Sequence, residues 1–260
     1  MGITERVLQA VIAASYSLGT LGAFYLARQL MMAPAMLIDS ALRPTLFANS
    51  ARSLNIDETR RRVAGLLALV VELQMPLLVF CLFWMKPVLL YAAGEKWSEL
   101  ATIAWWYIIP GSTAAITSWL DRMFDLLGRQ RLYTAIQLGS DLAACAVTLA
   151  VPYFGWPFES FIAALSLTIA ATHFAGLAAM FKVMGFTGSD TLNFFLRVAT
   201  IGAATAIIHW TIWVWVNALT GILCGTLVLL ASVAVTAGRR QRWWIGTFGS
   251  AAAIDPSRGA

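Results

Sequence analysis

Long apolar runs without charge alternate with short basic clusters along the chain, and this pattern limits the possible folds more than any other feature. Only 12% of the residues are charged and 60% are hydrophobic, which is about half the charged share of a soluble domain. A soluble fold could not cover so much apolar surface without large exposed patches. Runs of about 20 apolar residues have the length that crosses a bilayer as a helix. The pattern therefore predicts an all-α, polytopic transmembrane helical bundle.

Glycines, prolines and charges divide this apolar sequence into about eight predicted spans. The first apolar region is too long for one helix, and Gly19-Thr20-Leu21-Gly22 supplies a break. Pro76 and Pro110-Gly111 lie inside spans and predict points where a helix is weakened. Gly221 and Gly225 form a GxxxG motif, which allows close helix packing. The predicted helices cover residues 4–18, 21–48, 63–92, 98–127, 132–151, 159–184, 191–216 and 221–237.

Lysines and arginines fall almost entirely on one side of these helices. The poor side receives Lys86 and Lys96, whereas the rich side receives Arg6, the Arg52–Arg62 loop, Arg122, Arg129, Arg131, Lys182, Arg197 and the Arg239 cluster. Because loops rich in lysine and arginine stay in the cytoplasm, both termini are predicted to be cytoplasmic. The same clusters explain the net charge of +5 without nucleic acid. We expect residues 1–237 to form the bundle and residues 238–260 a basic, then polar, disordered tail.

The sequence contains no recognisable catalytic apparatus. Cys81, Cys145 and Cys224 are isolated within apolar runs, and His173 and His209 have no partner at metal-ligand spacing. Nucleotide-binding loops, zinc-protease motifs and nucleophile elbows are all missing from the sequence. We therefore expect neither an enzyme, nor a metal site, nor a cofactor.

One helix carries polar residues along a single face. Tyr25, Arg28, Met32, Asp39 and Arg43 recur at helical spacing within residues 21–48. Ionisable residues within spans are costly and usually face a polar cavity or each other. We predict that Tyr25, Arg28, Asp39 and Arg43 line a cavity that accepts an anionic headgroup. In the alternative interpretation, Arg28 reaches outward to the membrane surface and Asp39–Arg43 is a structural pair one turn apart.

Two isolated carboxylates lie inside other predicted spans. Glu72 precedes the proline of the third span, and Asp141 lies near the middle of the fifth. A buried carboxylate can titrate and couple transport to an ion, so both are candidates for ion coupling. A structural hydrogen bond to a neighbouring helix is the alternative. Asp121, Arg122 and Asp125 end the fourth span, where solvation of a helix end explains them.

Several segments, taken in order, resemble one family of transporters. They are the glycine-rich Leu18-Gly-Thr-Leu-Gly-Ala-Phe-Tyr-Leu-Ala-Arg-Gln-Leu30, then Pro34, Leu37-Ile-Asp-Ser-Ala-Leu42, Pro44-Thr-Leu-Phe-Ala-Asn-Ser50, Leu90-Tyr-Ala-Ala-Gly-Glu-Lys-Trp97, Pro110 and Leu126-Leu-Gly-Arg-Gln-Arg131. Their order over residues 1–185 is similar to the second half of polysaccharide flippases. These are the O-antigen and exopolysaccharide translocases of the multidrug/oligosaccharidyl-lipid/polysaccharide exporter superfamily.

This resemblance implies a function that residue patterns alone do not show. The family flips oligosaccharides linked to polyprenyl pyrophosphate across the bacterial cytoplasmic (inner) membrane, by alternating access of two helical lobes. It implies that Arg28 and Arg43 contact pyrophosphate or acidic sugars. The chain matches only the C-terminal lobe, so we expect a fragment, or a half that works with an N-terminal lobe or a second copy of itself among membrane lipids.

Two other functions stay open at the level of sequence. A lobe of a cation-coupled multidrug exporter would show a large hydrophobic cavity with one or two acidic residues. A membrane scaffold for polysaccharide-assembly enzymes, without transport, would show a cavity filled by side chains.

Overall fold

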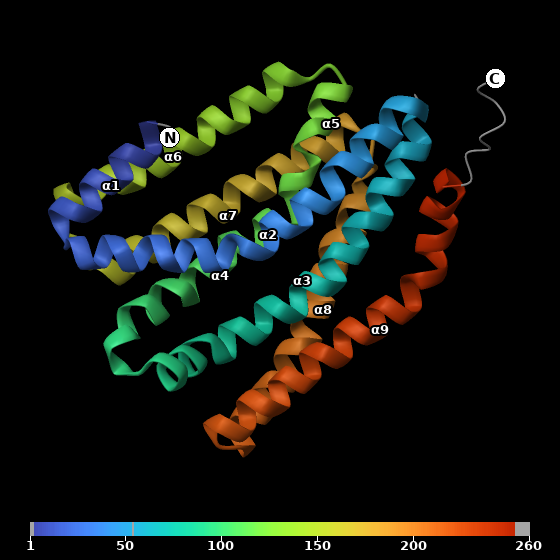
Figure 1. Cartoon of the computed structure of the whole chain (residues 1–260). Coiled ribbons are helices and arrows are strands. Elements are labelled where there is room, and N and C mark those ends of the chain that lie inside the picture. Colours follow the sequence, from blue (N-terminus) through green and yellow to red (C-terminus); the bar gives the residue numbers. More distant parts are fainter. Residues whose placement is uncertain (1–2, 54, 253–260) are drawn as a thin grey trace.

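The computed structural model describes residues 3–53 and 55–252, which form a bundle of α-helices (Figure 1). The helices are α1 (Ile3–Ser15), α2 (Leu18–Ser53), α3 (Ile56–Ala93), α4 (Ser98–Thr117), α5 (Asp121–Leu126), α6 (Gln130–Phe154), α7 (Phe158–Val183), α8 (Gly188–Trp215) and α9 (Ala218–Ala252), with short 3-10 turns at Glu95–Trp97 and Ser118–Leu120.

The predicted fold class, a polytopic helical bundle, is confirmed. Within the described residues, six helices are long and apolar enough to cross a membrane: α2, α3, α6, α7, α8 and α9. The other two predicted spans are not among the six. At 13 residues, α1 is about 20 Å long, which is shorter than the hydrocarbon core of a bilayer. The predicted span at residues 98–127 divides at Thr117 into α4, a 3-10 turn and α5. The chain is a multi-pass membrane protein.

The polar stretch at residues 49–62, which the sequence left between two spans, is helical over most of its length. α3 begins at Ile56 because the side chain of Asn55 accepts hydrogen bonds from two backbone N–H groups of the first turn. Ion pairs one turn apart then support the polar start of the helix: Asp57–Arg60 and Glu58–Arg62. Polar residues at a helix end therefore continue the helix beyond its apolar part.

The last helix also continues beyond its predicted end. The sequence placed the end of the last span at residue 237, whereas α9 continues to Ala252. The remainder of the predicted tail, residues 253–260, lies outside the described residues.

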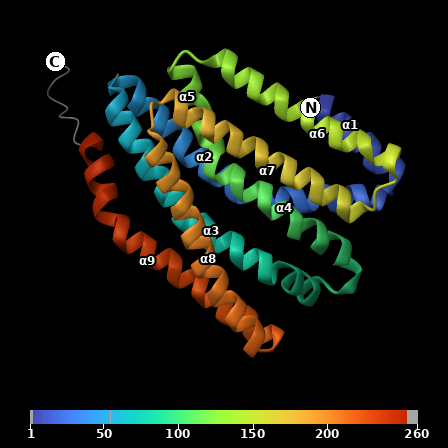
Figure 2. The same ribbon diagram turned by 180° about the vertical axis from the view of Figure 1, so that it is seen from behind.

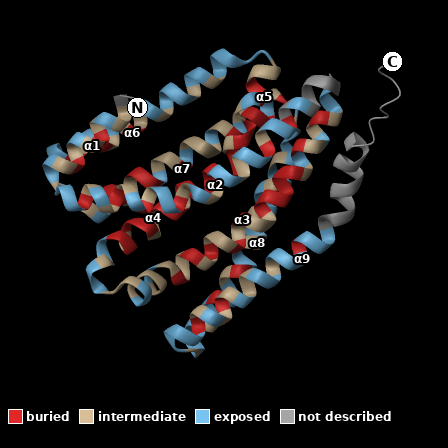
Figure 3. Cartoon of the chain, in the orientation of Figure 1, coloured by how far each residue is buried: buried red, intermediate tan, exposed pale blue. Residues whose placement is uncertain are grey.

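α4 occupies the centre of the bundle and is buried along most of its length (Figure 3). It packs against α2, α3 and α7. The sequence suggested that Pro110-Gly111 weakens this helix, but α4 runs through both residues. A Cβ atom at Gly111 would lie 2.3 Å from the backbone oxygen of Met31, so glycine is needed for the close approach of α2 and α4. This contact holds α2 against the core.

The remaining helices form two groups around α3 and α4. α6 packs against α7 and α1, whereas α8 and α9 pack along α3. Figure 2 shows the same helices from behind, with α8 in front of α3, α9 on one side and α6 and α7 on the other. The outward faces of α6, α8 and α9 carry many exposed apolar side chains. Such faces suit lipid or another helical bundle rather than water.

Candidate functional site

The polar face of α2 divides into two clusters. Near its start, the hydroxyl of Tyr25 donates a hydrogen bond to Glu5 Oε1 at 2.9 Å, and Arg28 forms an ion pair with the same carboxylate. Glu5 belongs to α1, so these contacts fix the short first helix to α2. Arg28 is therefore paired within the described bundle, and its predicted contact with an anionic headgroup stays a prediction.

The second cluster lies about three to four turns further along α2. Arg43 Nη2 is 2.7 Å from Asp39 Oδ1 and 3.4 Å from Asp121 Oδ2. It also donates a hydrogen bond to the backbone oxygen of Ser118 at 3.1 Å. The Asp39–Arg43 pair one turn apart is thus present, as the sequence suggested. Asp121 is a partner of Arg43 rather than only a solvated helix end, because the 3-10 turn before α5 brings it toward α2.

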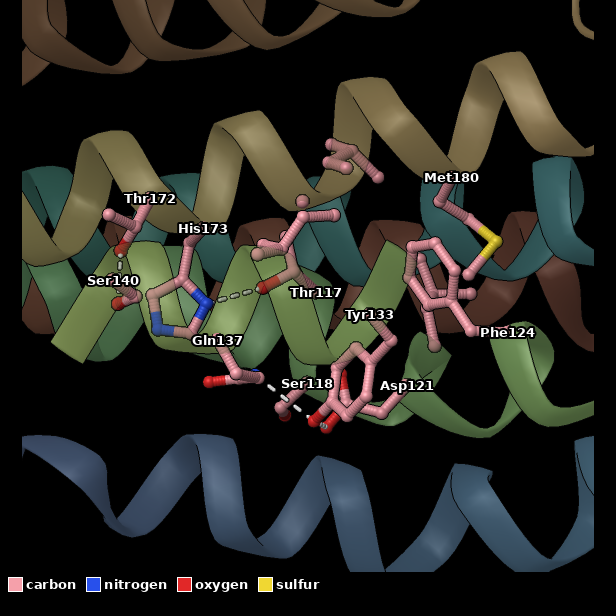
Figure 4. A pocket seen from close by; sticks show the side chains of 14 residues that line it. Thr117, Ser118, Asp121, Phe124, Tyr133, Gln137, Ser140, Thr172, His173 and Met180 are labelled. Carbon is pink, nitrogen blue, oxygen red and sulfur yellow. Dashed lines mark hydrogen bonds between the residues drawn. The ribbon is translucent and has the colours of Figure 1, made fainter. Parts of the chain in front are cut away.

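A cavity of about 130 Å³ lies beside Asp121, between the end of α4, α5, α6 and α7 (Figure 4). Phe124, Leu177 and Met180 form an apolar part of its wall. Much of the rest is polar, which is unusual inside such an apolar bundle. None of the four predicted cavity residues on α2 lines it; Arg43 reaches it only through its contacts with Asp121 and Ser118. We call this cavity the polar pocket.

Hydrogen bonds connect the polar pocket to the charged cluster. Gln137 Nε2 donates to the hydroxyl oxygen of Tyr133 at 3.0 Å, and that hydroxyl donates to Asp121 Oδ2 at 3.0 Å. Arg43 donates to the same carboxylate oxygen at 3.4 Å. The chain of contacts therefore runs from α6 through Asp121 to α2.

Two further pairs of side chains line the polar pocket. Thr117 Oγ1 lies 2.9 Å from His173 Nδ1, and Ser140 Oγ donates a hydrogen bond to Thr172 Oγ1 at 3.0 Å. The first pair joins α4 to α7, and the second joins α6 to α7. The sequence did not group these residues. A signal was nevertheless present, because Gln137 and Ser140 are three positions apart, on one face of a helix.

The two candidates for ion coupling lie away from the polar pocket. Glu72 on α3 forms an ion pair with Arg197 on α8. Asp141 on α6 is exposed and forms no ion pair or hydrogen bond with the residues that the structure describes. Its helix turns its neighbours Gln137 and Ser140 toward the pocket. The structure therefore does not bring the six predicted residues into one site.

Comparison with known proteins is informative for the first part of the chain. Residues 1–102 match the model of a family described as polysaccharide biosynthesis protein. No curated protein and no solved structure matches the chain. The matched segment includes α1, α2, α3 and the start of α4, and with them Arg28, Arg43 and Glu72. The predicted resemblance is thereby confirmed over residues 1–102, where this multi-pass membrane protein is similar to a family described as polysaccharide biosynthesis protein.

Proposed function

We propose that the protein is a transporter, not an enzyme, which flips a lipid-linked oligosaccharide across the bacterial cytoplasmic membrane for polysaccharide biosynthesis. The carrier lipid is of the polyprenyl-pyrophosphate type. The polar pocket within an apolar, multi-pass bundle is the observation that carries this proposal. Polar and ionisable side chains inside a membrane protein are costly, and they mark pathways for polar ligands. The family match adds the context of polysaccharide biosynthesis.

The faces beside the polar pocket support alternating access with a second bundle. Exposed apolar side chains line α2 and α6 on their outward sides: Leu26, Leu30, Met36, Leu37, Leu138 and Leu142. A pathway that opens alternately to two sides of the membrane needs two bodies that move against each other. The second body is an N-terminal lobe or a second copy of this chain, and membrane lipids cover the remaining apolar faces.

The proposed orientation follows from the lysine and arginine bias. The ends of α2 and α5 lie on the side rich in these residues, so the Arg43–Asp121 cluster is at the cytoplasmic end of the bundle. Both termini are cytoplasmic in this arrangement. A lipid-linked sugar made on the cytoplasmic side would then meet the polar pocket from the side of synthesis.

The observed cavities bear differently on the two alternative functions, a scaffold and a multidrug exporter. A scaffold would have side chains filling the space that the polar pocket leaves open. A multidrug exporter would have a large hydrophobic cavity, whereas the polar pocket is small and rich in hydroxyl groups. Two features favour the exporter: the carboxylates beside the polar pocket, which would attract an organic cation, and a separate, mainly apolar cavity of about 440 Å³ whose lining includes Phe83, Trp105 and Trp213.

The test removes the gene from its source organism and follows the lipid-linked oligosaccharide. We expect surface polysaccharide to be lost while the intermediate accumulates on the cytoplasmic face, where membrane-impermeant glycosidases reach it only in inverted vesicles. Complementation with the intact gene should reverse both effects. Normal surface polysaccharide in the deletion strain, or an intermediate that is equally accessible from the outer face, would contradict the proposal.

A complementing Arg28→Ala variant examines the predicted headgroup contact. The substitution removes the ion pair with Glu5 and leaves that carboxylate with the hydrogen bond from Tyr25. We expect less exported polysaccharide at an unchanged amount of protein in the membrane. Unchanged export would show that Arg28 does not contact the transported lipid. A loss of protein from the membrane would show that Arg28 serves the packing of α1 against α2.

A further inference from the structure

The hydrogen bonds of His173 determine which of its nitrogens faces the polar pocket as an acceptor. The Thr117 hydroxyl donates its one hydrogen to the backbone oxygen of Thr113 at 2.9 Å. With that hydrogen used, its oxygen accepts the hydrogen bond from His173 Nδ1, which assigns the Nδ1–H tautomer to this histidine. A neutral imidazole carries a single N–H, so Nε2 keeps a lone pair. Figure 4 shows this second nitrogen on the side of the ring away from Thr117.

The other polar side chains leave acceptors facing the polar pocket for a similar reason. Gln137 donates one of its two amide N–H bonds to Tyr133, which leaves its Oε1 to accept and a second N–H to donate. Ser140 donates its hydrogen to Thr172, so its oxygen also retains lone pairs. The lining thus presents mainly acceptors to whatever enters.

The charges around the polar pocket do not favour an anion. Arg43 lies between the carboxylates of Asp39 and Asp121. The neighbouring Arg122 is paired with Asp125 at 3.2 Å. Carboxylates therefore outnumber guanidinium groups in this cluster. A pyrophosphate in the pocket would meet an excess of negative charge together with oxygen and nitrogen lone pairs.

Donor groups nevertheless lie beside these acceptors. Among the described residues that line the polar pocket, Ser118 Oγ is buried without a hydrogen-bond partner, and Gln137 keeps one N–H. A bare metal cation could satisfy only the acceptors, and a phosphate only the donors. Hydroxyl groups both donate and accept, so a polyhydroxylated group satisfies the whole lining.

The size of the polar pocket limits how much of a ligand it can hold. Its volume of about 130 Å³ corresponds to about four water molecules at roughly 30 Å³ each. Sites for whole drug-sized ligands are larger, at roughly 300–1,000 Å³. One edge of a sugar ring matches this space, and the rest of a lipid-linked oligosaccharide would lie outside it.

We propose that the polar pocket binds the hydroxyl groups of one neutral sugar ring, and that Arg43 is the counter-ion of Asp39 and Asp121 rather than a ligand of the pyrophosphate. This inference rests on the proposed function and names the part of the substrate that this site recognises. The pyrophosphate is held elsewhere, and the sugar determines the specificity of the pocket.

A cysteine reporter tests the proposal in the purified full-length protein. Cys81, Cys145 and Cys224 are first replaced by alanine, and Ile136→Cys then places a thiol in the lining without removing a polar group. Ala135→Cys, on the exposed side of the same helix, is the control. The rate of maleimide labelling is measured with polyprenyl pyrophosphate that carries a neutral sugar, with the same carrier without sugar, with the free sugar and with sodium chloride.

We expect the sugar-bearing carrier to slow labelling at position 136 but not at position 135. The free sugar should do the same at higher concentration if the ring alone is recognised, and protection by the carrier-linked sugar alone would show that the lipid must deliver it. The sugar-free carrier should give no protection. Equal protection by the sugar-free carrier, protection by sodium chloride alone, or no protection by any sugar would overturn the proposal.

Pairs of variants then identify which side chains of the polar pocket accept hydrogen bonds from the sugar. Ser140→Ala removes a hydroxyl from the lining, and we expect half-protection to need about three- to tenfold more sugar-bearing carrier. Thr134→Ala, which removes an exposed hydroxyl from the same helix, should leave protection unchanged. His173→Asn keeps an N–H near the Nδ1 position and removes the Nε2 acceptor, whereas His173→Gln places an amide near Nε2. Protection should fall in the asparagine variant and persist better in the glutamine variant.

The outcome separates this proposal from the proposed function. Transport of the intermediate without sugar-dependent protection would overturn the sugar site and leave the flippase function standing. Sugar-dependent protection in a protein whose deletion leaves export intact would support the site and contradict the flippase function.

Discussion

The polar pocket and the junction of α3, α8 and α9 both contain a histidine between helices, but they use it differently. In the junction, Trp84 Nε1 donates a hydrogen bond to His209 Nδ1 at 3.0 Å, and both side chains are completely buried. The rings of Phe80 and Phe83 lie 6.0 Å from the imidazole. His173, in contrast, borders open space lined by hydroxyl groups. Identical residue types therefore serve packing in one region and can meet a ligand in the other.

Glycines show the same difference between the two regions. A Cβ atom at Gly221 would lie 2.3 Å from Trp84, and one at Gly225 would lie 2.8 Å from it. The close packing predicted from the GxxxG motif is thus confirmed, with the indole ring of Trp84 as the group that is packed. A Cβ atom at Gly176 in the polar pocket would lie 3.8 Å from Ile136 Cγ2, an ordinary van der Waals contact. The junction has no spare volume at these positions, whereas the polar pocket keeps some.

The largest expected effect on stability comes from removing the indole ring of Trp84 from the junction. Trp84→Ala should lower the free energy of unfolding by about 3–5 kcal/mol, because the large cavity cannot collapse fully. Thermal unfolding in detergent measures the change. Trp215→Ala is the control, since that side chain is 81% exposed. Equal losses in the two variants would mean that the junction is not a tightly packed region.

The next effect comes from overfilling the same site. Gly221→Ala should lower the free energy of unfolding by about 1–3 kcal/mol, because its methyl group clashes with the Trp84 ring. Gly238→Ala on the same helix meets nothing within 4 Å and should be neutral or slightly stabilising. In the Trp84→Ala background, Gly221→Ala should cost much less, since the clashing ring is gone. Strictly additive losses would show that the two residues do not interact.

Replacing each of the two histidines by asparagine tests the comparison between the two regions most directly. His209→Asn leaves the indole N–H of Trp84 without its ring acceptor, so we expect a loss of about 1–3 kcal/mol in stability. His173→Asn keeps the contact with Thr117 and should cost less than about 1 kcal/mol, while sugar-dependent protection falls. Unfolding and maleimide labelling are measured on both variants. A stability loss that is larger for His173 would reverse the roles given to the two regions.

Much of the fold could be predicted because the position of most helices follows from the hydropathy of their own sequence. Apolar runs bounded by glycines and charges located the helices of the described residues except α5, which the prediction joined to α4, and they located the turn at Gly128, where φ is +66°. The ends were less accurate where polar residues remain helical, as at Asn55 and in the last helix. Such ends depend on capping and side-chain pairing, which hydropathy does not measure.

The polar pocket could not be assembled in the same way. Spacing shows which residues share a face of one helix, but the contact of Arg43 with Asp121 joins positions 78 residues apart. The polar side chains of α6 and α7 are each unremarkable within their own span. They form a site only because α4 places Thr117 against His173. Single residues inside spans and the pair Asp39–Arg43 within one helix were therefore recognised, whereas partners on other helices were not.

The smallest expected effect on stability distinguishes the two carboxylates predicted for ion coupling. Asp141 is exposed beside the outward leucines of α6, so Asp141→Asn should change the free energy of unfolding by less than about 0.5 kcal/mol. Glu72→Gln disrupts the ion pair with Arg197 and should cost up to about 1 kcal/mol. If Asp141 takes part in coupling, Asp141→Asn should make transport in vesicles insensitive to the ion gradient while the bundle stays intact. A variant that is stable and still responds to the gradient would leave Asp141 as a residue of the outer face, with a role only toward the second bundle.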